Sequence, residues 1–287
     1  EEIMIQRSQS NSFSGNLRLE GKVAIITGGA SGIGAKTVEI FHLHGAKIVI
    51  ADIQDELGGA VANIVGENVS YVHCDVSNEK DVHNLVNFTI SKHGKLDIIF
   101  SNAGIFDKPN GSIVEAKKSD LEKMLRVNLI GAFLSAKHAS RVMIPRRSGC
   151  ILFTASACTS IAGLASHCYA ASKHGIVGLA KNLTLELGQY GIRVNCISPY
   201  GVLTGGTASD CMSEVEKERV ELAMSAMGNL KGQTLTTDGV AHAALFLASD
   251  EASYVSGLNL VVDGGFSVVN PSFLMARDAL HDHRVGM

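Results

Sequence analysis

The stretch "KVAIITGGASGIG", residues 22–34, determines how the rest of the chain is interpreted. An apolar, β-branched run (22–27) leads directly into a glycine-rich turn and then into an amphipathic stretch, which predicts a strand, a tight turn and a helix. Gly28, Gly32 and Gly34 would let bare backbone approach a pyrophosphate at the positive end of that helix. Glycine also suits a plain strand-to-helix turn, and the spacing differs from G-x-G-x-x-G. A second predicted strand follows, as the dinucleotide-binding interpretation requires.

Six further apolar runs of the same kind follow, with helical stretches between most of them. The strand-like runs are 47–51, 69–74, 96–101, 150–156, 192–198 and 258–263. The stretches with apolar residues three or four apart are 31–44, 79–93, 119–143 and 169–189. Continuous apolar strands separated by helices argue for a parallel sheet covered on both faces. We therefore expect an α/β fold, a single Rossmann-like, doubly wound domain with a seven-stranded parallel sheet.

The domain is expected to span residues 19–267, between a disordered leader (1–18) and a C-terminal tail (268–287). The leader lacks the long apolar core of a secretory signal, and a trimmed targeting segment is the alternative. Residues 203–236, called the flap below, interrupt the rhythm after the sixth strand and contain one expected helix, about 213–227. Because long insertions in compact domains are usually functional or disordered, we expect a mobile lid over a ligand crevice.

Composition excludes several classes of protein. A net charge of −3 without clustered basic residues argues against a nucleic-acid partner. No apolar stretch approaches the ~20 residues that a membrane span needs. The histidines form no H-E-x-x-H and no Cys/His pattern, so metal binding is not expected. Scattered cysteines indicate reduced thiols and a cytoplasmic protein. They are Cys74, Cys150, Cys158, Cys168, Cys196 and Cys211.

Acidic residues end two of the predicted strands beside the glycine turn. Asp52 ends the second strand, where a carboxylate can accept hydrogen bonds from both ribose hydroxyls of an adenosine. Taken alone it would be read as a polar strand end. Asp75, after the third strand, could receive the adenine amino group. Ser31 and Ile53 occupy the positions where an Arg or Lys could bind the 2′-phosphate of NADP. The sequence therefore predicts NAD rather than NADP.

A second group of polar residues follows in the middle of the chain. Tyr169 and Lys173, in "SHCYAASKHG" (166–175), are four positions apart and would share one face of a helix. Alone, such a pair is more often a solvated surface pair. Ser156 ends the fifth predicted strand, where it could equally cap a helix. Asn128 is an awkward residue inside an apolar helix unless its amide finds a partner.

Taken in order, these features resemble the classical short-chain dehydrogenase/reductase family, from about residue 19 to 267. The shared elements are "TGGASGIG", "SNAG" (101–104), Ser156 and the Tyr169/Lys173 pair thirteen residues later. "SNAG" departs from the usual "NNAG", and "PYG" stands in place of "PG", which could reshape the wall near the substrate. "NCISPY", "NLKG" and "YVSGLNLVVDGG" followed by "NPSF" resemble the plant secoisolariciresinol and borneol-type dehydrogenases.

The resemblance implies an oxidoreductase that uses a nicotinamide dinucleotide. Tyr169 would take the proton of an alcohol while hydride leaves the carbinol carbon. Lys173 would hold the nicotinamide ribose and, with the oxidised nicotinamide, lower the tyrosine pKa. Ser156 would hold the substrate oxygen, and Asn128 would hold a water that leads from Lys173 to solvent. The expected cofactor-binding residues are Gly28, Ser31, Gly32, Ile33, Gly34, Asp52, Ile53, Asp75, Val76, Asn102, Ala103, Gly104, Tyr169, Lys173, Val202 and Thr204, the last two as contacts of the nicotinamide carboxamide.

The expected substrate is a bulky, uncharged alcohol, a terpenoid such as borneol or a lignan. This expectation rests on an apolar set without a basic group for a carboxylate or phosphate, although such residues could simply belong to the core. The set is Phe106, Ala157, Cys158, Ile161, Tyr200, Met212, Met224 and Met227. The predicted reaction is the reversible, NAD-dependent oxidation of a secondary hydroxyl. A ketone reductase of the same family, a non-catalytic dinucleotide sensor and a scaffolding role stay open as alternatives. Apolar residues on several faces of 119–143 and 169–189 indicate a homo-oligomer, by resemblance a homotetramer.

Overall fold

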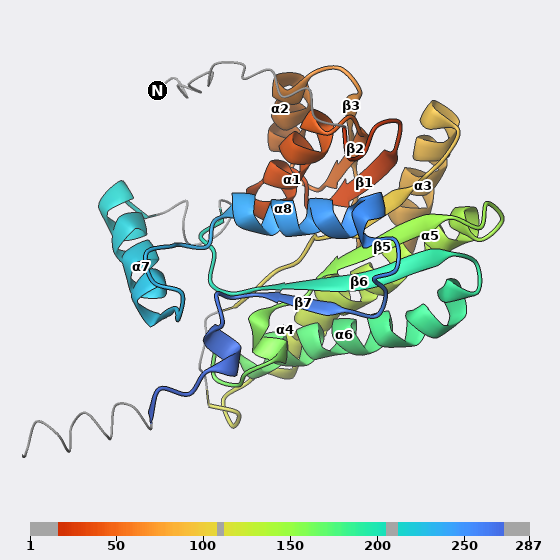
Figure 1. Ribbon diagram of the computed structural model, residues 1–287. Helices are drawn as coiled ribbons and strands as arrows, with labels where there is room; N and C mark the ends of the chain where they lie inside the picture. The colour runs from red at the N-terminus through yellow and green to blue at the C-terminus, as the bar shows by residue number, and fades with distance from the viewer. Residues whose placement is uncertain (1–16, 108–111, 205–211, 273–287) are drawn as a thin grey trace, which may run out of the picture.

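The computed structural model describes residues 17–107, 112–204 and 212–272. Its seven strands are all parallel and form one sheet in the order β3-β2-β1-β4-β5-β6-β7 (Figure 1). The chain therefore starts in the middle of the sheet, builds one half outward and then crosses over to build the other, which confirms the predicted doubly wound fold. The strands are β1 (Val23–Thr27), β2 (Lys47–Asp52), β3 (Val69–His73), β4 (Ile98–Ser101), β5 (Gly149–Thr154), β6 (Ile192–Pro199) and β7 (Asn259–Val262).

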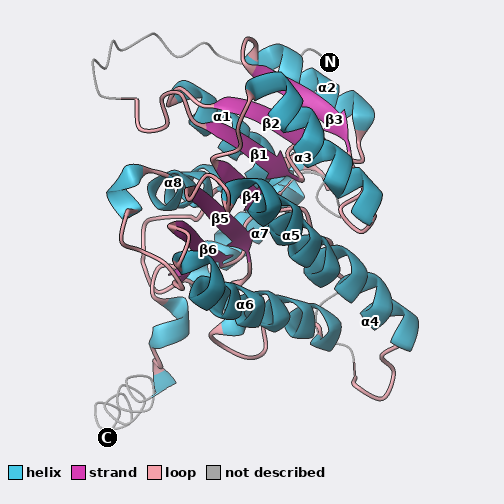
Figure 2. Ribbon diagram, turned by 90° about the vertical axis from the view of Figure 1, so that its right-hand side faces the viewer, coloured by secondary structure: helices cyan, strands magenta, loops and turns pink. Residues whose placement is uncertain are grey.

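Helices cover both faces of this sheet (Figures 1 and 2). One layer consists of α1 (Gly32–Leu43), α2 (Asp55–Val65) and α8 (Thr237–Ala248). The other consists of α3 (Glu79–His93), α4 (Lys118–Met124), α5 (Gly131–Met143) and α6 (His167–Gly188). Short 3₁₀ turns are η2 (Ala157–Thr159), η4 (Asp250–Ala252) and η5 (Phe266–Val268).

The two layers explain why the strands read as continuous apolar runs. Successive side chains of a strand point to opposite faces, and here both faces are buried. Ile25 of β1 belongs to the core cluster beneath α3, α5 and α6. Its neighbour Ile26 belongs to the cluster beneath α1 and α8, together with Phe41 and Leu245. Every residue of β1 is therefore buried, as its sequence predicts.

The expected continuous helix over 119–143 is wrong in one respect. Between α4 and α5 the chain makes a π-helical turn, η1 (Leu125–Ile130), which contains Asn128. Such turns commonly mark functional sites, because they change the direction of side chains within a helix. Here the turn accompanies hydrogen bonds from the Asn128 amide to the main chain of Ile105, which lies outside the helix.

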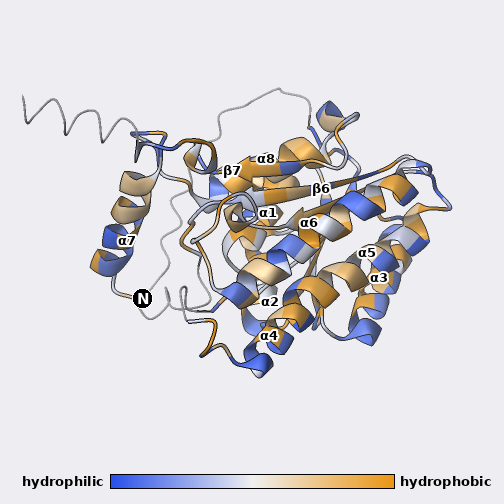
Figure 3. Ribbon diagram, turned by 90° about the horizontal axis from the view of Figure 1, so that it is seen from below, coloured by the Kyte–Doolittle hydropathy of each residue, from blue (hydrophilic) through white to orange (hydrophobic). Residues whose placement is uncertain are grey.

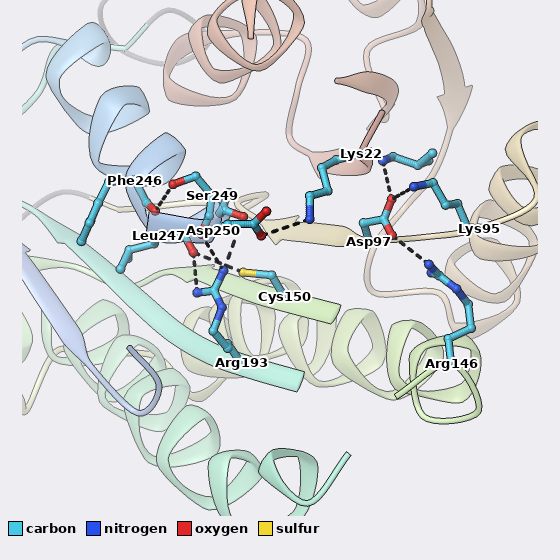
Figure 4. A network of polar contacts seen from close by, with 12 residues as sticks. Lys22, Lys95, Asp97, Arg146, Cys150, Arg193, Phe246, Leu247, Ser249 and Asp250 are labelled. Carbon is cyan, nitrogen blue, oxygen red and sulfur yellow. Dashed lines mark hydrogen bonds and ion pairs between the residues drawn. The ribbon is translucent and has the colours of Figure 1, made fainter. Parts of the chain in front are cut away.

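A polar network joins elements at the amino ends of the strands (Figure 4). The Asp97 carboxylate accepts from the main-chain N–H of Val23 at 2.8 Å and forms ion pairs with Lys95 at 2.8 Å and Arg146 at 2.9 Å. Burial acts to raise the pKa of Asp97, but the hydrogen bonds from Lys95, Val23 and Arg146 outweigh it, so the pKa lies below the ordinary value. The carboxylate thereby links the starts of β1 and β4 to Arg146, which lies between α5 and β5.

In the same region, Arg193 satisfies the carbonyl groups at the end of α8 (Figure 4). Its guanidinium donates to Leu247 O at 2.6 Å and to Ser249 O at 3.2 Å, so it closes a helix end that would otherwise leave buried acceptors unpaired. Lys22 and Asp250 form an exposed ion pair at 3.1 Å beside it.

The structure describes residues on both sides of the expected start of the domain at residue 19. Leu19 is fully buried and its N–H donates to His44 O, while Arg18, expected in the leader, pairs with Glu251 at 2.6 Å. The rest of the leader, and the tail beyond residue 272, lie outside the described residues. Cys74, Cys150, Cys158, Cys168 and Cys196 are free and buried, as predicted, whereas Cys211 falls in an undescribed range. Within the described ranges, none of the helices has the length and apolar character to cross a membrane.

The flap contains the predicted helix, α7 (Glu214–Met227). Ser213 caps it through a capping box with Glu216, so its start is fixed locally. None of its residues is buried, and in Figure 1 it stands to one side of the sheet, away from the two helix layers. Residues 205–211 of the flap lie outside the described residues. An element with so little buried surface can open at a low cost in free energy, and its role as a lid stays a prediction.

Candidate active site

The glycine turn is packed directly against the loop that follows β4. Gly28 has φ +64°, and a Cβ there would lie 2.8 Å from the Cα of Ala103. Gly34, in the first turn of α1, lies so close beneath the glycine turn that a Cβ would lie 1.9 Å from Gly28 O. Gly32 has φ +55°, and a Cβ would meet the side chain of Thr204. These positions need glycine for conformation and space, and they leave bare backbone facing the cleft described below.

Three polar side chains hold the turn and the loop together. Thr27 Oγ1 accepts from the N–H groups of Asn102 and Ala103, both at 3.0 Å. The Asn102 amide donates to the carbonyls of Thr27 and Gly28, and its oxygen accepts from Thr154 Oγ1 at 2.9 Å. Sequence reasoning missed the roles of Thr27 and Thr154. A polar residue at the last position of an otherwise apolar strand is the signal that could have found them.

Asp52 presents a fixed carboxylate at the edge of the same turn. One oxygen accepts from Ala30 N–H at 3.0 Å and the other from Gln54 N–H at 3.1 Å. The residue is only 7 % exposed. Both oxygens are thus oriented by main-chain donors from the glycine turn and from the start of α2, so the charge cannot easily turn away from a ligand.

The Tyr169/Lys173 pair is not a solvated surface pair. Ser166 caps α6 by accepting from Tyr169 N–H at 3.0 Å, which fixes the first turn of the helix. Lys173 is 3 % exposed, and its ammonium donates to Thr154 O at 2.8 Å. The same nitrogen lies 5.4 Å from the centre of the Tyr169 ring. The helix therefore delivers a phenol and a buried cation to one place.

Burial dominates the electrostatics of this pair. It raises the pKa of Tyr169, against a smaller lowering effect of the hydrogen bond with Ser156. It also lowers the pKa of Lys173 to about 8. Both shifts favour the neutral forms, because a charge is costly where water is excluded. The expected lowering of the tyrosine pKa involves the oxidised nicotinamide as well as Lys173, so it stays a prediction for the protein with its cofactor bound.

Ser156 lies two residues beyond β5. Its hydroxyl caps a 3₁₀ turn and also lies next to the Tyr169 phenol. Its Oγ accepts from Cys158 N–H at 3.3 Å, so it caps the 3₁₀ turn η2. It also hydrogen-bonds the Tyr169 side chain, which places a hydroxyl next to the phenol. The cap fixes the backbone that positions this hydroxyl.

Asn128 has the partner that its sequence position demands. Its amide oxygen accepts from Ile105 N–H at 2.8 Å, and its amide nitrogen donates to Ile105 O at 2.9 Å and to Ser172 Oγ at 3.0 Å. It thus clamps the loop after β4 onto α6. The water-holding role stays a prediction, and the side chain's visible task is to position these two elements.

A cleft of about 590 Å³ runs across the carboxyl ends of the strands. Of the predicted cofactor residues, only Gly34 and Val202 do not line it: Gly34 supports the turn from beneath, and Val202 packs on the core. The cleft reaches from Asp52 and Asp75 to Tyr169 and Lys173. Sequence reasoning did not assign the lining residues Ala51, Gln54, Cys74, Ser77, Ile105, Lys123, Arg126, Val127 and Thr154.

The predicted substrate residues do not form one wall. Phe106 lines the cleft, while Ala157 and Cys158 are buried. Tyr200 and Met224 line a separate cavity of about 240 Å³ between the flap and the end of β7. The Tyr200 ring stacks on Phe266 at 4.5 Å, which draws it toward the C-terminal end of the domain.

The fold and this cleft define a class of protein. A parallel sheet with a glycine turn before α1, and an acidic residue at the end of β2, fits a dinucleotide, whose charge the bare backbone and helix terminus can accept. At the other end of the cleft a phenol, a hydroxyl and a buried ammonium meet, as proton transfer to or from an alcohol oxygen requires. The site is that of an oxidoreductase that binds a nicotinamide dinucleotide.

Comparison with known proteins gives the family. The sequence profile described as enoyl-(acyl carrier protein) reductase matches residues 28–267. The chain is 66 % identical to tropinone reductase-like 1 of Erythroxylum coca, over 88 % of this chain and 93 % of that protein. It is 63 % identical to (+)-borneol dehydrogenase 1 of Salvia officinalis (88 % and 96 %) and 55 % identical to secoisolariciresinol dehydrogenase of Forsythia intermedia (88 % and 91 %). The chain belongs to the short-chain dehydrogenase/reductase family, and its resemblance to borneol-type and secoisolariciresinol dehydrogenases is confirmed.

Proposed function

We propose that this protein is an NAD-dependent alcohol dehydrogenase that reversibly oxidises the secondary hydroxyl of a bulky, apolar alcohol to the ketone. The observation that carries the proposal is the single cleft that has the Asp52 carboxylate at one end and Tyr169 with Lys173 at the other. Binding at the first end would orient a dinucleotide so that its reactive ring lies near the second.

Each catalytic residue has one task in this proposal. A bound NAD supplies the hydride acceptor and a positive ring charge. Tyr169 takes the proton of the substrate hydroxyl as phenolate, and Ser156 holds the same oxygen by a hydrogen bond. The ammonium of Lys173 stabilises the phenolate and lies where it can bond the cofactor ribose. Burial opposes the phenolate in the protein alone, and the positive ring of a bound NAD would favour it.

The preference for NAD rests on the fixed charge of Asp52. Main-chain donors hold both carboxylate oxygens, so the group cannot rotate to make room for a 2′-phosphate. The neighbouring Ile53 is 62 % exposed and offers no positive charge at this edge. Repulsion between two anions at hydrogen-bonding range would exclude NADP.

The substrate class rests on the relatives and on one apolar part of the cleft; Lys123 and Arg126, which the sequence analysis did not place in the site, line the same cleft. Phe106 is half-exposed in the cleft, beside Ile105 and Val127, and suits an uncharged hydrocarbon skeleton. Borneol and secoisolariciresinol appear in the names of related dehydrogenases, and both are bulky alcohols. A terpenoid or lignan alcohol is therefore our first candidate.

Ketone reduction is the second candidate, favoured by the name of the tropinone reductase-like relative. The same site catalyses both directions, since the phenol that accepts a proton in one direction donates it in the other. A non-catalytic sensor would have no use for a buried tyrosine and lysine in the cleft, so we set that alternative aside.

We further propose a cytoplasmic homotetramer. Ile130 and Phe133 are half-exposed on the outer side of the helix layer, and Leu185 of α6 is mostly exposed. In Figures 2 and 3 α5 and α6 lie side by side on one face and carry apolar stretches that a second copy could cover. Free, buried thiols suit a reducing compartment. Light scattering of wild type and Phe133→Glu would test the assembly: a variant mass equal to that of wild type contradicts the use of this face.

The activity is tested by following NADH formation with a panel of alcohols. The panel should contain borneol, a lignan diol, a small secondary alcohol and a hydroxy acid, each with NAD and with NADP, and Tyr169→Phe serves as the control protein. We expect turnover of the bulky, uncharged alcohols with NAD. Turnover of the hydroxy acid alone, or none of any alcohol or of the matching ketones with NADH, would contradict the proposal.

A further inference from the structure

An acidic residue that no catalytic motif includes lies at the start of the catalytic helix. Asp107 Oδ1 accepts a short hydrogen bond from Ser166 Oγ, and Ser166 Oγ in turn accepts from Tyr169 N–H at 3.0 Å. A chain of two hydrogen bonds thus joins the loop after β4 to the residue that carries the phenol. Ser166 is 8 % exposed, so this connection is largely shielded from water.

The loop that carries Asp107 is itself anchored. Two residues before Asp107, both main-chain groups of Ile105 are bonded to the Asn128 amide. The same amide donates to Ser172 Oγ of α6. The loop is therefore fastened to α6 twice, once at its cap and once a turn beyond Tyr169. A movement of Asp107 would be transmitted to the position of the phenol.

Asp107 also places a negative charge near Tyr169. A carboxylate at a helix N-terminus stabilises the helix, but it opposes a negative charge on Tyr169 nearby. The other groups that face Tyr169 are the Lys173 ammonium, the Cys158 thiol and the Ser156 hydroxyl. Asp107 is the negative group among them when the thiol is protonated.

On its other side Asp107 faces further titratable groups. Cys168 of α6 and Asp120 of α4 share this corner, and the two carboxylates, with burial as the larger cause, raise the pKa of the Cys168 thiol. The thiol therefore stays neutral near pH 7, and a change at Asp107 is felt mainly by Tyr169 and by the helix cap.

We propose that Asp107 is a positioning residue that sets the pH range in which Tyr169 gives up its proton, while its bond to Ser166 holds the first turn of α6. The inference rests on the proposed function, in which Tyr169 is the acid/base group. The hydrogen bond to Ser166 and the charge of Asp107 affect catalysis in different ways. The hydrogen bond supports catalysis at every pH, whereas the charge shifts the pH at which catalysis begins.

Two variants separate these effects. Asp107→Asn keeps an oxygen that accepts from Ser166 and removes only the charge. We expect its kcat/KM for alcohol oxidation to begin rising at lower pH, with the midpoint moved by roughly half a unit to one unit. Ser166→Ala keeps the charge of Asp107 and removes the hydrogen bond that joins Asp107 to α6. We expect roughly a three- to tenfold lower kcat with an unchanged midpoint, since the first turn of α6, which carries Tyr169, loses its cap.

A second readout does not depend on turnover. The ultraviolet absorbance of tyrosinate is titrated for wild type and Asp107→Asn, with and without NAD, and each is compared with its Tyr169→Phe counterpart, so that the difference belongs to Tyr169. A lower titration midpoint in Asp107→Asn supports the proposal. An unchanged or higher midpoint, in kinetics or absorbance, overturns it, and so does an equal shift in Ser166→Ala. If Asp107→Asn does not fold, Asp107→Ser removes the same charge. Absence of any dehydrogenase activity in wild type would instead refute the proposed function, and the absorbance titration would still decide the present inference.

Discussion

Asp52→Asn is the substitution that tests the choice of cofactor most directly. It removes the charge at the edge of the glycine turn with little change in size. It also exchanges one carboxylate oxygen for an NH₂ group, which cannot accept from Ala30 N–H or Gln54 N–H, so one of two main-chain bonds is lost. The expected result therefore has two parts, a lower activity with NAD and a relieved repulsion of NADP.

The size of the second part follows from the geometry. A 2′-phosphate in place of a hydroxyl bonded to Asp52 would lie about 5 Å from the Asp52 carboxylate, and both groups are negative. At an effective dielectric constant near 20, the repulsion costs about 3 kcal/mol for each unit of phosphate charge. That is more than a hundredfold in kcat/KM. The wild type should prefer NAD by at least that factor. In Asp52→Asn we expect NAD activity to fall roughly tenfold, as loss of a charged hydrogen bond predicts, and the preference to shrink to about tenfold or less.

The assay compares kcat/KM for NAD and NADP in wild type, Asp52→Asn and Asp75→Asn. Asp75 lines the same cleft but would face the adenine, which both cofactors share. Its substitution should weaken both cofactors alike and leave their ratio unchanged. Equal use of the two cofactors by wild type, or an unchanged ratio in Asp52→Asn, would refute the assignment of Asp52.

Four further results are expected. Tyr169→Phe should abolish turnover and leave NAD binding, measured by fluorescence, largely intact; a tenth of wild-type kcat would disprove the acid/base role. Lys173→Met should lose activity and cofactor affinity together, because one ammonium serves both, and normal affinity would show that the lysine is misplaced. Hydrogen exchange should be fast in α7 of the free protein, which buries no residue, and should slow when cofactor and substrate are both present; slow exchange throughout the free flap would rule out a lid. Asp97→Asn should lower Tm at neutral pH and reduce the free energy of unfolding by about 2–4 kcal/mol. Because the pKa of Asp97 is depressed on folding, its contribution is present above the ordinary value of 3.8 and is lost as pH falls through the folded pKa, so the two proteins should converge in strong acid.

The sequence predicted most of the fold because its patterns are local and repeated. β1 alternates between two buried faces, which yields a continuous apolar run, and the glycines of the first turn are required by backbone conformation and by close contacts. The position of Asp52 followed because the carboxyl ends of parallel strands lie on one edge of the sheet, and Tyr169 and Lys173 share one face of α6 because they are four residues apart.

What the sequence did not predict depends on contacts between distant segments. The π-helical turn accompanies bonds between Asn128 and Ile105, which no periodicity reports. The direction in which the pKa of Tyr169 shifts from its ordinary value depends on how completely the pocket excludes water. The role of Thr154, whose carbonyl receives the Lys173 ammonium and whose hydroxyl donates to Asn102, is visible only when β5, the loop after β4 and α6 are assembled.

The network around Asp97 and Arg193 has a consequence for engineering this protein. It fastens the amino ends of the strands, the margin of the sheet opposite to the cleft. The loops that shape the cleft, after β4 and β6, can therefore be exchanged without cutting any of these bonds. Loop libraries that retain this network, together with Asn102, Ile105 and Asp107 of the loop after β4, should yield folded proteins with altered ligand selectivity, since the Asp97 and Arg193 bonds lie on the opposite rim of the domain.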